Sequence, residues 1–208
     1  MTRATSLVTA ALLAAMIAAG CASGPAPPES RPYTELVQAF RADKDLAFRT
    51  SDESPIPPEQ RAAFKGLVYF PIDPAYRVPA RLTEELSPKP VIIELETSKG
   101  QRDRLRKVGS LGFAVQGQPL RLTAFADVNA RTFDQLFVPF GDLTNRRETY
   151  GGGRYLNLVR TPTGLYDLDF NQASNPYCVY NYAYECPVPP PENRLAVAIP
   201  AGEMLGGK

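Results

Sequence analysis

The chain has 208 residues, which corresponds to one domain or two small ones. Its 23 basic and 22 acidic side chains give a net charge of +1, so nothing in the charge balance indicates nucleic acid as a partner. Histidine is absent, which excludes a Ser-His-Asp triad, a Cys-His dyad and a histidine-ligated metal centre. The 21 prolines, about 10% of the chain and roughly twice the usual frequency, argue against an all-helical bundle because proline breaks helix interiors.

The first 21 residues have the features of a lipoprotein signal. Arg3 precedes an uncharged, mostly apolar run from Leu7 to Ile17, which is too short to span a bilayer, since a spanning helix needs about 20 residues. Small residues then precede Cys21, an order that resembles the bacterial lipobox. We therefore expect residues 1–20 to be a signal peptide and Cys21 to be acylated. The alternative is a plain secretory signal in which Cys21 is incidental.

This signal predicts the location and the domain layout. We expect a lipid-anchored protein of the bacterial cell envelope, facing the periplasm or the cell exterior, with the membrane as a partner through acylated Cys21. Residues 21–32 contain the lipidated cysteine and a proline-rich tether, whose extended form reaches roughly 34 Å. Residues 33–208 then form a single mainly-β domain.

Hydrophobic spacing predicts the fold class. Tyr33, Leu36, Val37 and Phe40 recur at helical intervals, which indicates an amphipathic helix over residues 33–48. From residue 76 the period changes to two, in short runs separated by turns. We therefore expect a mainly β fold with a minor α part: an antiparallel sheet curled into a barrel or a sandwich, preceded by the N-terminal helix.

The last expected hairpin pairs residues 154–160 with residues 165–170 around a turn at 161–164. In that register Arg154 lies nearly opposite Asp169. We therefore expect these two side chains to share a pocket or an ion pair.

Cys178 and Cys186 are the cysteines that remain after Cys21. Outside the cytoplasm, an isolated pair this close in sequence is expected to form a disulfide. The alternatives are weaker, because two cysteines without histidine fill only half of a zinc shell and because a redox pair normally has the Cys-x-x-Cys spacing.

Asp167, Asp169 and Asn171 match the first three ligand positions of an EF-hand calcium loop. Gln172 and Cys178 stand where that loop needs glycine and glutamate, so we expect no EF-hand. A carboxylate site for a hard cation on this strand face is the alternative. We expect the protein to use no metal and no other cofactor.

Four distinctive strings are spread along the chain after the tether: FKGLVYFPIDPAYRV from Phe64, LFVPFGDLTNRRETYGGGRYL from Leu136, DFNQASNPYCVYNYAYECPVPPPENRL from Asp169, and AIPAGE from Ala198. Together they resemble an uncharacterised prokaryotic family, the domain of unknown function 1684. The resemblance implies a family in which lipoprotein signals are common. It implies no reaction.

Two of these strings supply the candidate site. The first carries polar residues around three glycines, which would allow a ligand close to the backbone; the alternative is a wide turn with a solvated rim. The second contains an unperiodic, tyrosine-rich stretch from Phe170 to Arg194, which would line a pocket or, alternatively, form a rigid lid that completes the core. We expect the ligand-binding residues to be Asn145, Glu148, Tyr150, Arg154, Asp169, Asn171 and Asn175.

Three functions compete. The preferred hypothesis is a binding module with a polar, tyrosine-lined pocket, in which Arg154 holds a small polar or anionic ligand. The second is a structural envelope lipoprotein without a small ligand. The third is a hydrolase of envelope material with Glu148 and Asp169 as acid and base. The sequence sets no oligomeric state.

Overall fold

The computed structural model describes residues 31–206. The predicted signal peptide, Cys21 and most of the predicted tether therefore lie outside the described residues.

Helix α1 spans Tyr33–Thr50, which confirms the predicted N-terminal helix. It begins after Pro32, where the missing amide hydrogen of proline costs no helical hydrogen bond. Val37 and Phe48 are buried against the rest of the domain, as the helical spacing predicts. The helix ends at Thr50, and the amide of the next residue, Ser51, donates to the carbonyl of Ala47. A short helix α2 (Pro58–Arg61) follows.

Seven strands form within the described part of the chain. They are β1 (Arg77–Glu84), β2 (Val91–Glu96), β3 (Arg102–Val115), β4 (Gln118–Ala126), β5 (Gln135–Phe140), β6 (Arg154–Val159) and β7 (Tyr166–Asp169). Single turns of 3-10 helix lie at Pro74–Tyr76, Phe170–Gln172, Tyr177–Val179 and Pro191–Asn193.

The strands make one antiparallel sheet in the order β6-β5-β4-β3-β1-β7, with β2 also paired to β3. Strand β3 is long enough to take both partners on one edge, β2 along residues 102–107 and β1 along residues 109–112. A bulge between Lys107 and Gly109 lies where the partner changes. The two end strands, β6 and β7, approach each other, so the sheet is nearly closed into a barrel. The predicted fold class is confirmed.

The predicted pairing of β6 with β7 is wrong. Strand β6 pairs with β5, and β7 pairs with β1, where Arg77 stands opposite Asp169. The two strands are adjacent at the turn that joins them, where Arg160 and Tyr166 form an isolated β-bridge, but they form no continuous ladder. Beyond the end of β7, the backbone of Tyr155 in β6 exchanges two hydrogen bonds with the backbone of Ser174, at 2.8 and 3.0 Å. The string from Leu136 contributes all but the first residue of β5.

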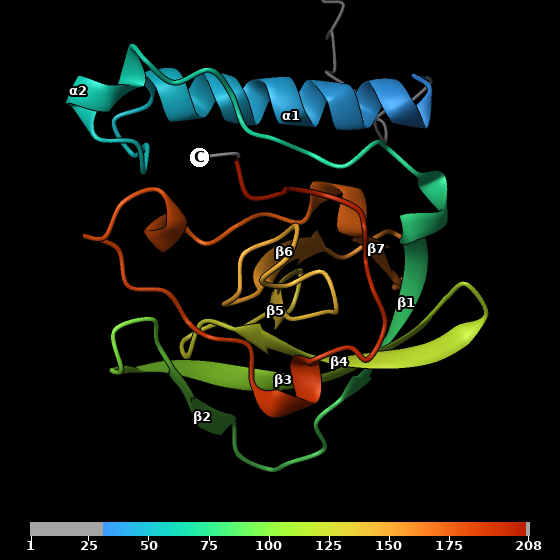
Figure 1. Ribbon diagram of the computed structural model, residues 1–208. Helices are drawn as coiled ribbons and strands as arrows, with labels where there is room; N and C mark the ends of the chain where they lie inside the picture. Colours follow the sequence, from blue (N-terminus) through green and yellow to red (C-terminus); the bar gives the residue numbers. More distant parts are fainter. Residues whose placement is uncertain (1–30, 207–208) are drawn as a thin grey trace, which may run out of the picture. The chain divides into compact units, whose positions relative to one another are not determined.

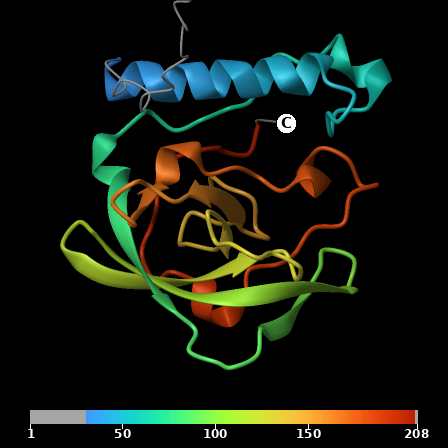
Figure 2. The ribbon, with the colours of Figure 1, turned by 180° about the vertical axis from the view of Figure 1, so that it is seen from behind.

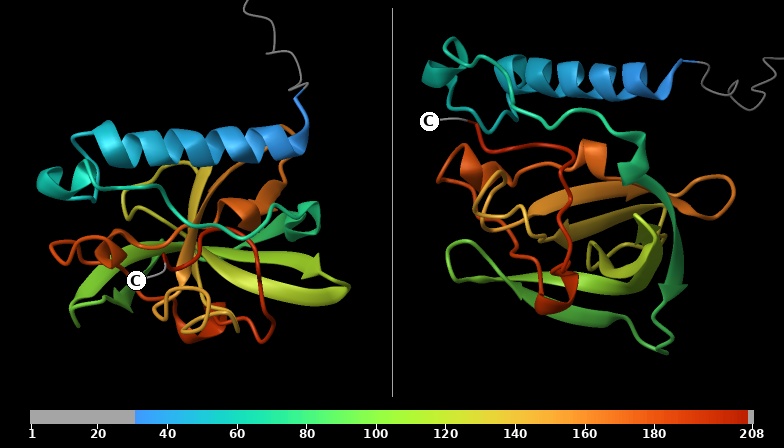
Figure 3. Two further views of the ribbon diagram at one scale, coloured as in Figure 1. Left: turned by 45° about the horizontal axis from the view of Figure 1, so that its top comes forward. Right: turned by 45° about the vertical axis from the view of Figure 1, so that its right-hand side comes forward.

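The barrel encloses the apolar core. Its fully buried side chains come from most of the strands and include Leu111, Leu122, Val138, Leu156, Leu168 and Phe170. Helix α1 lies along one side of the barrel, and β2, β3 and β4 form the opposite side (Figures 1 and 3). The segment that follows β7 passes between them, which is also visible from behind (Figure 2). No helix within residues 31–206 is long and apolar enough to cross a membrane.

Candidate functional site

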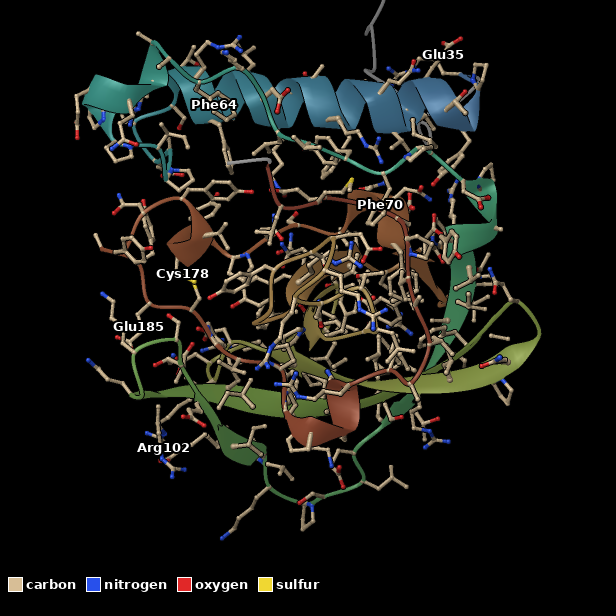
Figure 4. The ribbon with its side chains drawn as sticks, in the orientation of Figure 1. Glu35, Phe64, Phe70, Arg102, Cys178 and Glu185 are labelled. Carbon is tan, nitrogen blue, oxygen red and sulfur yellow. The ribbon has the colours of Figure 1, made fainter. Side chains whose placement is uncertain are left out.

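A cavity of about 640 Å³ lies beside α1. Its walls come from α1, from the turn at residues 51–55, from β3, β5 and β6, and from residues 174–177 and 184–187. Figure 4 labels Cys178 and Glu185, which lie on the segment from residue 174 to residue 187; this segment runs between α1 and the β2–β3 turn. The volume falls in the range of about 300–1,000 Å³ that small-molecule sites occupy.

Aromatic rings make up much of the cavity wall. On one side, Phe48 of α1 packs edge-on against Tyr177 at 5.8 Å between ring centroids, and Tyr177 packs in the same way on Tyr184 at 5.3 Å. On the sheet, Phe137 packs against Tyr155 at 4.8 Å. These edge-to-face contacts hold the rings in fixed orientations. The cavity is therefore tyrosine-lined, with Tyr177 and Tyr184 drawn from the segment that the sequence singled out.

Four charged side chains line the cavity: Lys44, Glu53, Asp103 and Glu185. Lys44 is already paired, because its Nζ lies 2.7 Å from Oε2 of Glu203. Glu185 accepts a hydrogen bond from the hydroxyl of Thr97. Glu53 and Asp103 are exposed. The lining therefore carries an excess of negative charge.

Glu203 is the buried partner beneath this wall. Its carboxylate accepts hydrogen bonds from the amide and side chain of Asn175, each at 3.1 Å, in addition to the bond from Lys44. Burial raises the pKa of Glu203, and the nearby charge of Lys44 opposes that rise. The Nδ2 group of Asn175 also donates to the carbonyl of Met204. Its Oδ1 is buried and has no hydrogen-bond partner within residues 31–206.

Arg154 is fully buried and binds protein groups. Its Nη2 lies 2.9 Å from Oδ2 of Asp142 and also donates to the carbonyl of Ile199, while its Nη1 donates to the carbonyls of Ala201 and Glu203. Burial lowers the pKa of Arg154, while the Asp142 carboxylate counteracts this effect. The predicted ion pair with Asp169 does not form, because β7 turns towards β1 and Asp142 takes that place.

Asp142 is near the beginning of a compact turn that follows β5. Its Oδ1 accepts from the amide and hydroxyl of Thr144, and Asn145 Oδ1 accepts from the amide of Asp142. Asn145 Nδ2 donates to the hydroxyl of Thr149. These bonds tie Asn145 into the fold. Glu148 is exposed in this turn, and its carbonyl accepts from the amide of Leu205.

The three glycines, residues 151–153, leave no open space in which a ligand could approach the backbone. A side chain at Gly153 would meet the Phe140 carbonyl oxygen and Pro189 Cγ, each at 2.6 Å. The space over Gly152 is filled by the ring of Tyr150. The glycines therefore permit close packing of this loop against the protein itself.

Asp169 and Asn171 form a second polar cluster beneath the start of α1. Asp169 Oδ1 accepts from the hydroxyl of Tyr33 at 2.8 Å and from the Asn171 amide at 3.0 Å, and its Oδ2 accepts from Gln172. Asn171 Nδ2 donates to the carbonyl of Asp73. Burial raises the pKa of Tyr33, and the hydrogen bond to Asp169 raises it further. This cluster fastens α1 to the end of β7.

Cys178 and Cys186 are neighbours in space and are free thiols in the structure, without the expected disulfide. The amide of Cys178 lies 3.2 Å from the sulfur of Cys186, which lines the cavity. Burial raises the pKa of Cys186 to about 12. Burial also raises the pKa of Tyr150, and the Cys178 thiol beside it adds to that effect.

Of the seven predicted ligand-binding residues, Asn175 lines the cavity. Asp169 lines a smaller one of about 240 Å³ between β6 and β7. Sequence reasoning missed Lys44, Asp142 and Glu203. Asp142 and Glu203 lie within the distinctive strings, which was the sequence feature that could have identified them. No sequence feature identifies Lys44, because a single lysine on an amphipathic helix is usually a solvated residue. Within residues 31–206, no cluster of three or more cysteine or carboxylate side chains is arranged to hold a metal ion.

Comparison with known proteins agrees with the four strings. The family described as "Protein of unknown function (DUF1684)" matches residues 62–204. The solution NMR structure of an uncharacterised protein of Haloarcula marismortui is similar over 82% of this chain and 92% of that chain, with 41% identity and a TM-score of 0.63. No curated protein matches the chain.

Proposed function

Because the chain belongs to the DUF1684 family, whose description assigns no activity, we propose a function from its own geometry. The protein is a lipid-anchored binding module of the cell envelope, and the cavity beside α1 holds a small organic ligand. One observation carries the proposal: a cavity of about 640 Å³ whose wall combines fixed aromatic rings with a few polar groups.

The cavity wall is ordered by the protein itself, which favours binding. The Tyr155 hydroxyl donates to the Pro187 carbonyl, and the amide of Ser98 donates to the carbonyl of Cys186. These bonds tie the segment that carries Tyr184 to β6 and to the β2–β3 turn. A wall that is already in place loses little conformational entropy when a ligand enters.

The anchor rests on the order of charge, apolar run, small residues and Cys21 in the sequence. The tether ends at Pro32, where α1 begins, and α1 contributes Phe40, Lys44 and Phe48 to the cavity. The proposed anchor thus connects through a short tether to a wall of the binding site.

Binding is tested by what the full-length protein carries when extracted from bacterial membranes in mild detergent. Ala47→Trp places a large ring in the cavity lining, whereas Ala42→Trp changes an exposed position of the same helix that does not line the cavity. We expect mass spectrometry to find the same small molecule released from the unmodified protein and from Ala42→Trp, and far less from Ala47→Trp. Equal amounts from all three, or none from any, would contradict the proposal.

A further inference from the structure

The charges of the cavity wall indicate which chemical class of ligand fits. We propose that the ligand is an organic cation: an ammonium or amidinium group attached to an apolar body. This inference rests on the proposed function, because it names the ligand of the same cavity.

The first argument is the unbalanced charge of the lining. Lys44, whose ammonium is the cation of the wall, lies 2.7 Å from the buried carboxylate of Glu203 and is therefore neutralised. Glu53, Asp103 and Glu185 form no ion pair with any residue between 31 and 206. The nearby Lys99 is exposed, donates to the carbonyl of Ala183 and does not line the cavity. A cation that entered would meet three carboxylates that have no cationic partner among the described residues.

The second argument is the aromatic wall. Phe48, Tyr177 and Tyr184 contact one another edge to face, and Phe137 packs on Tyr155 in the same way. The face of such a ring attracts a cation, and its area also contacts an apolar body. Lys44 already makes this interaction, with its Nζ 5.3 Å from the centroid of Phe48.

The third argument is an acceptor without a donor. Asn175 is 97% buried in the wall, since its exposed fraction is 3%. Its nitrogen is committed to Glu203 and Met204, whereas its oxygen has no donor among the described residues. This oxygen is shielded from the cavity, so it makes no direct contact with a ligand, but its unpaired negative end adds to the negative potential behind the wall.

The same contacts argue against an anion. Arg154, the residue expected to hold a carboxylate or phosphate, is fully buried and engaged by Asp142 and by carbonyls of the C-terminal segment. An anionic ligand would therefore meet Glu53, Asp103 and Glu185 with no unpaired cation in the cavity lining.

Three probes of nearly equal size separate these possibilities: 2-phenylethylammonium, 2-phenylethanol and phenylacetate. Titration calorimetry on the full chain should show the ammonium binding about tenfold or more tightly than the alcohol, and phenylacetate most weakly. Asp103→Asn and Glu53→Gln should each weaken the ammonium by about three- to tenfold and leave the alcohol unchanged. Both residues are exposed, so neither exchange removes a buried contact. Asp134→Asn, an exposed carboxylate outside this lining, is the charge-matched control and should change none of the three.

The outcomes distinguish the two proposals. If the alcohol or phenylacetate binds as tightly as the ammonium, the cavity binds ligands but the cation preference is wrong. If Asp134→Asn weakens the ammonium as much as Asp103→Asn does, the preference comes from net charge and the assignment to this wall is wrong. If none of the three probes binds, both the cation preference and the proposed function fail.

Discussion

Arg154 and Asp142 form an ion pair with an N–O distance of 2.9 Å, and both side chains are completely shielded from solvent. The pair connects the first residue of β6 to the turn that follows β5. Through the carbonyls of Ile199, Ala201 and Glu203, Arg154 also fixes the C-terminal segment. That segment in turn presents Glu203 to Lys44 and Asn175 under the cavity.

Removing one charge of this pair should destabilise the fold strongly. Asp142→Asn leaves the buried guanidinium uncompensated, which should lower the free energy of unfolding by about 3–5 kcal/mol. Asp167→Asn is the matched control, because Asp167 pairs with Arg77 at 2.6 Å on the surface; it should cost less than about 1 kcal/mol. Urea denaturation measures both. Similar losses of unfolding free energy for the two variants would show that the buried Arg154–Asp142 pair contributes no more to stability than a surface pair.

The helix and the local hairpins were predictable because their signals are local. The apolar spacing from Tyr33 to Phe40 predicted α1, and short alternating runs separated by turns predicted antiparallel strands, which the structure contains in the β2–β3 and β3–β4 hairpins. The partner of β7 was not predictable in this way. Its pairing with β1 joins residues about ninety positions apart, such as Arg77 and Asp169, and nothing in either strand encodes that choice.

The candidate site was predictable only in part for the same reason. The tyrosines that follow β7 signalled an aromatic wall, and Tyr177 and Tyr184 line the cavity. The Lys44–Glu203 pair, by contrast, joins α1 to the C-terminal segment across 159 positions. Asp142 likewise looks like an ordinary turn residue until the fold buries it. The roles of these residues depend on which distant segments bury them in the fold, and a single sequence does not contain that information.

The stability of the protein should depend on the ionisation of Glu203. Its pKa is raised in the fold, so the folded chain binds this proton more tightly than the unfolded chain, and ionisation costs stability. The cost is absent well below the ordinary value of 4.5 and grows as pH rises from there through the raised folded value. We expect the unfolding free energy of the unmodified protein to fall with pH relative to Glu203→Gln over this window.

Lys44→Met provides the opposing variant. It removes the charge that stabilises ionised Glu203, so the fall in unfolding free energy with rising pH should become steeper than in the unmodified protein. Thermal melts across the acidic range measure all three proteins. If the three pH profiles run parallel, Glu203 does not contribute as described.

Cys178 and Cys186 should be joined in protein taken from an oxidising envelope. Their contact across a short loop predicts a disulfide that stabilises the fold by about 2.5 kcal/mol. Thiol labelling of denatured, unreduced protein should then modify neither cysteine, whereas labelling after reduction should modify both. Two labelled cysteines before reduction would mean that the thiols stay free in the envelope.

Cys21 should be the first residue of the mature chain and should carry the lipid. Cys21→Ser should move the protein from the membrane fraction to the soluble fraction, because the lipid is attached through the sulfur and the serine variant lacks this anchor. Fractionation followed by mass spectrometry of the N-terminal peptide measures this. A serine variant that stays in the membrane and is cleaved at the same position would contradict the lipoprotein assignment.

The claim that the cavity beside α1 is a binding site is tested most directly by an experimental structure of the full-length protein extracted from bacterial membranes. We predict density for one small organic molecule between Phe48 and Tyr177 on one side and Phe137 and Tyr155 on the other, with its positive group towards Asp103, Glu53 or Glu185. A cavity that contains only water, or one closed by inward movement of Tyr177 and Tyr184, would contradict the account.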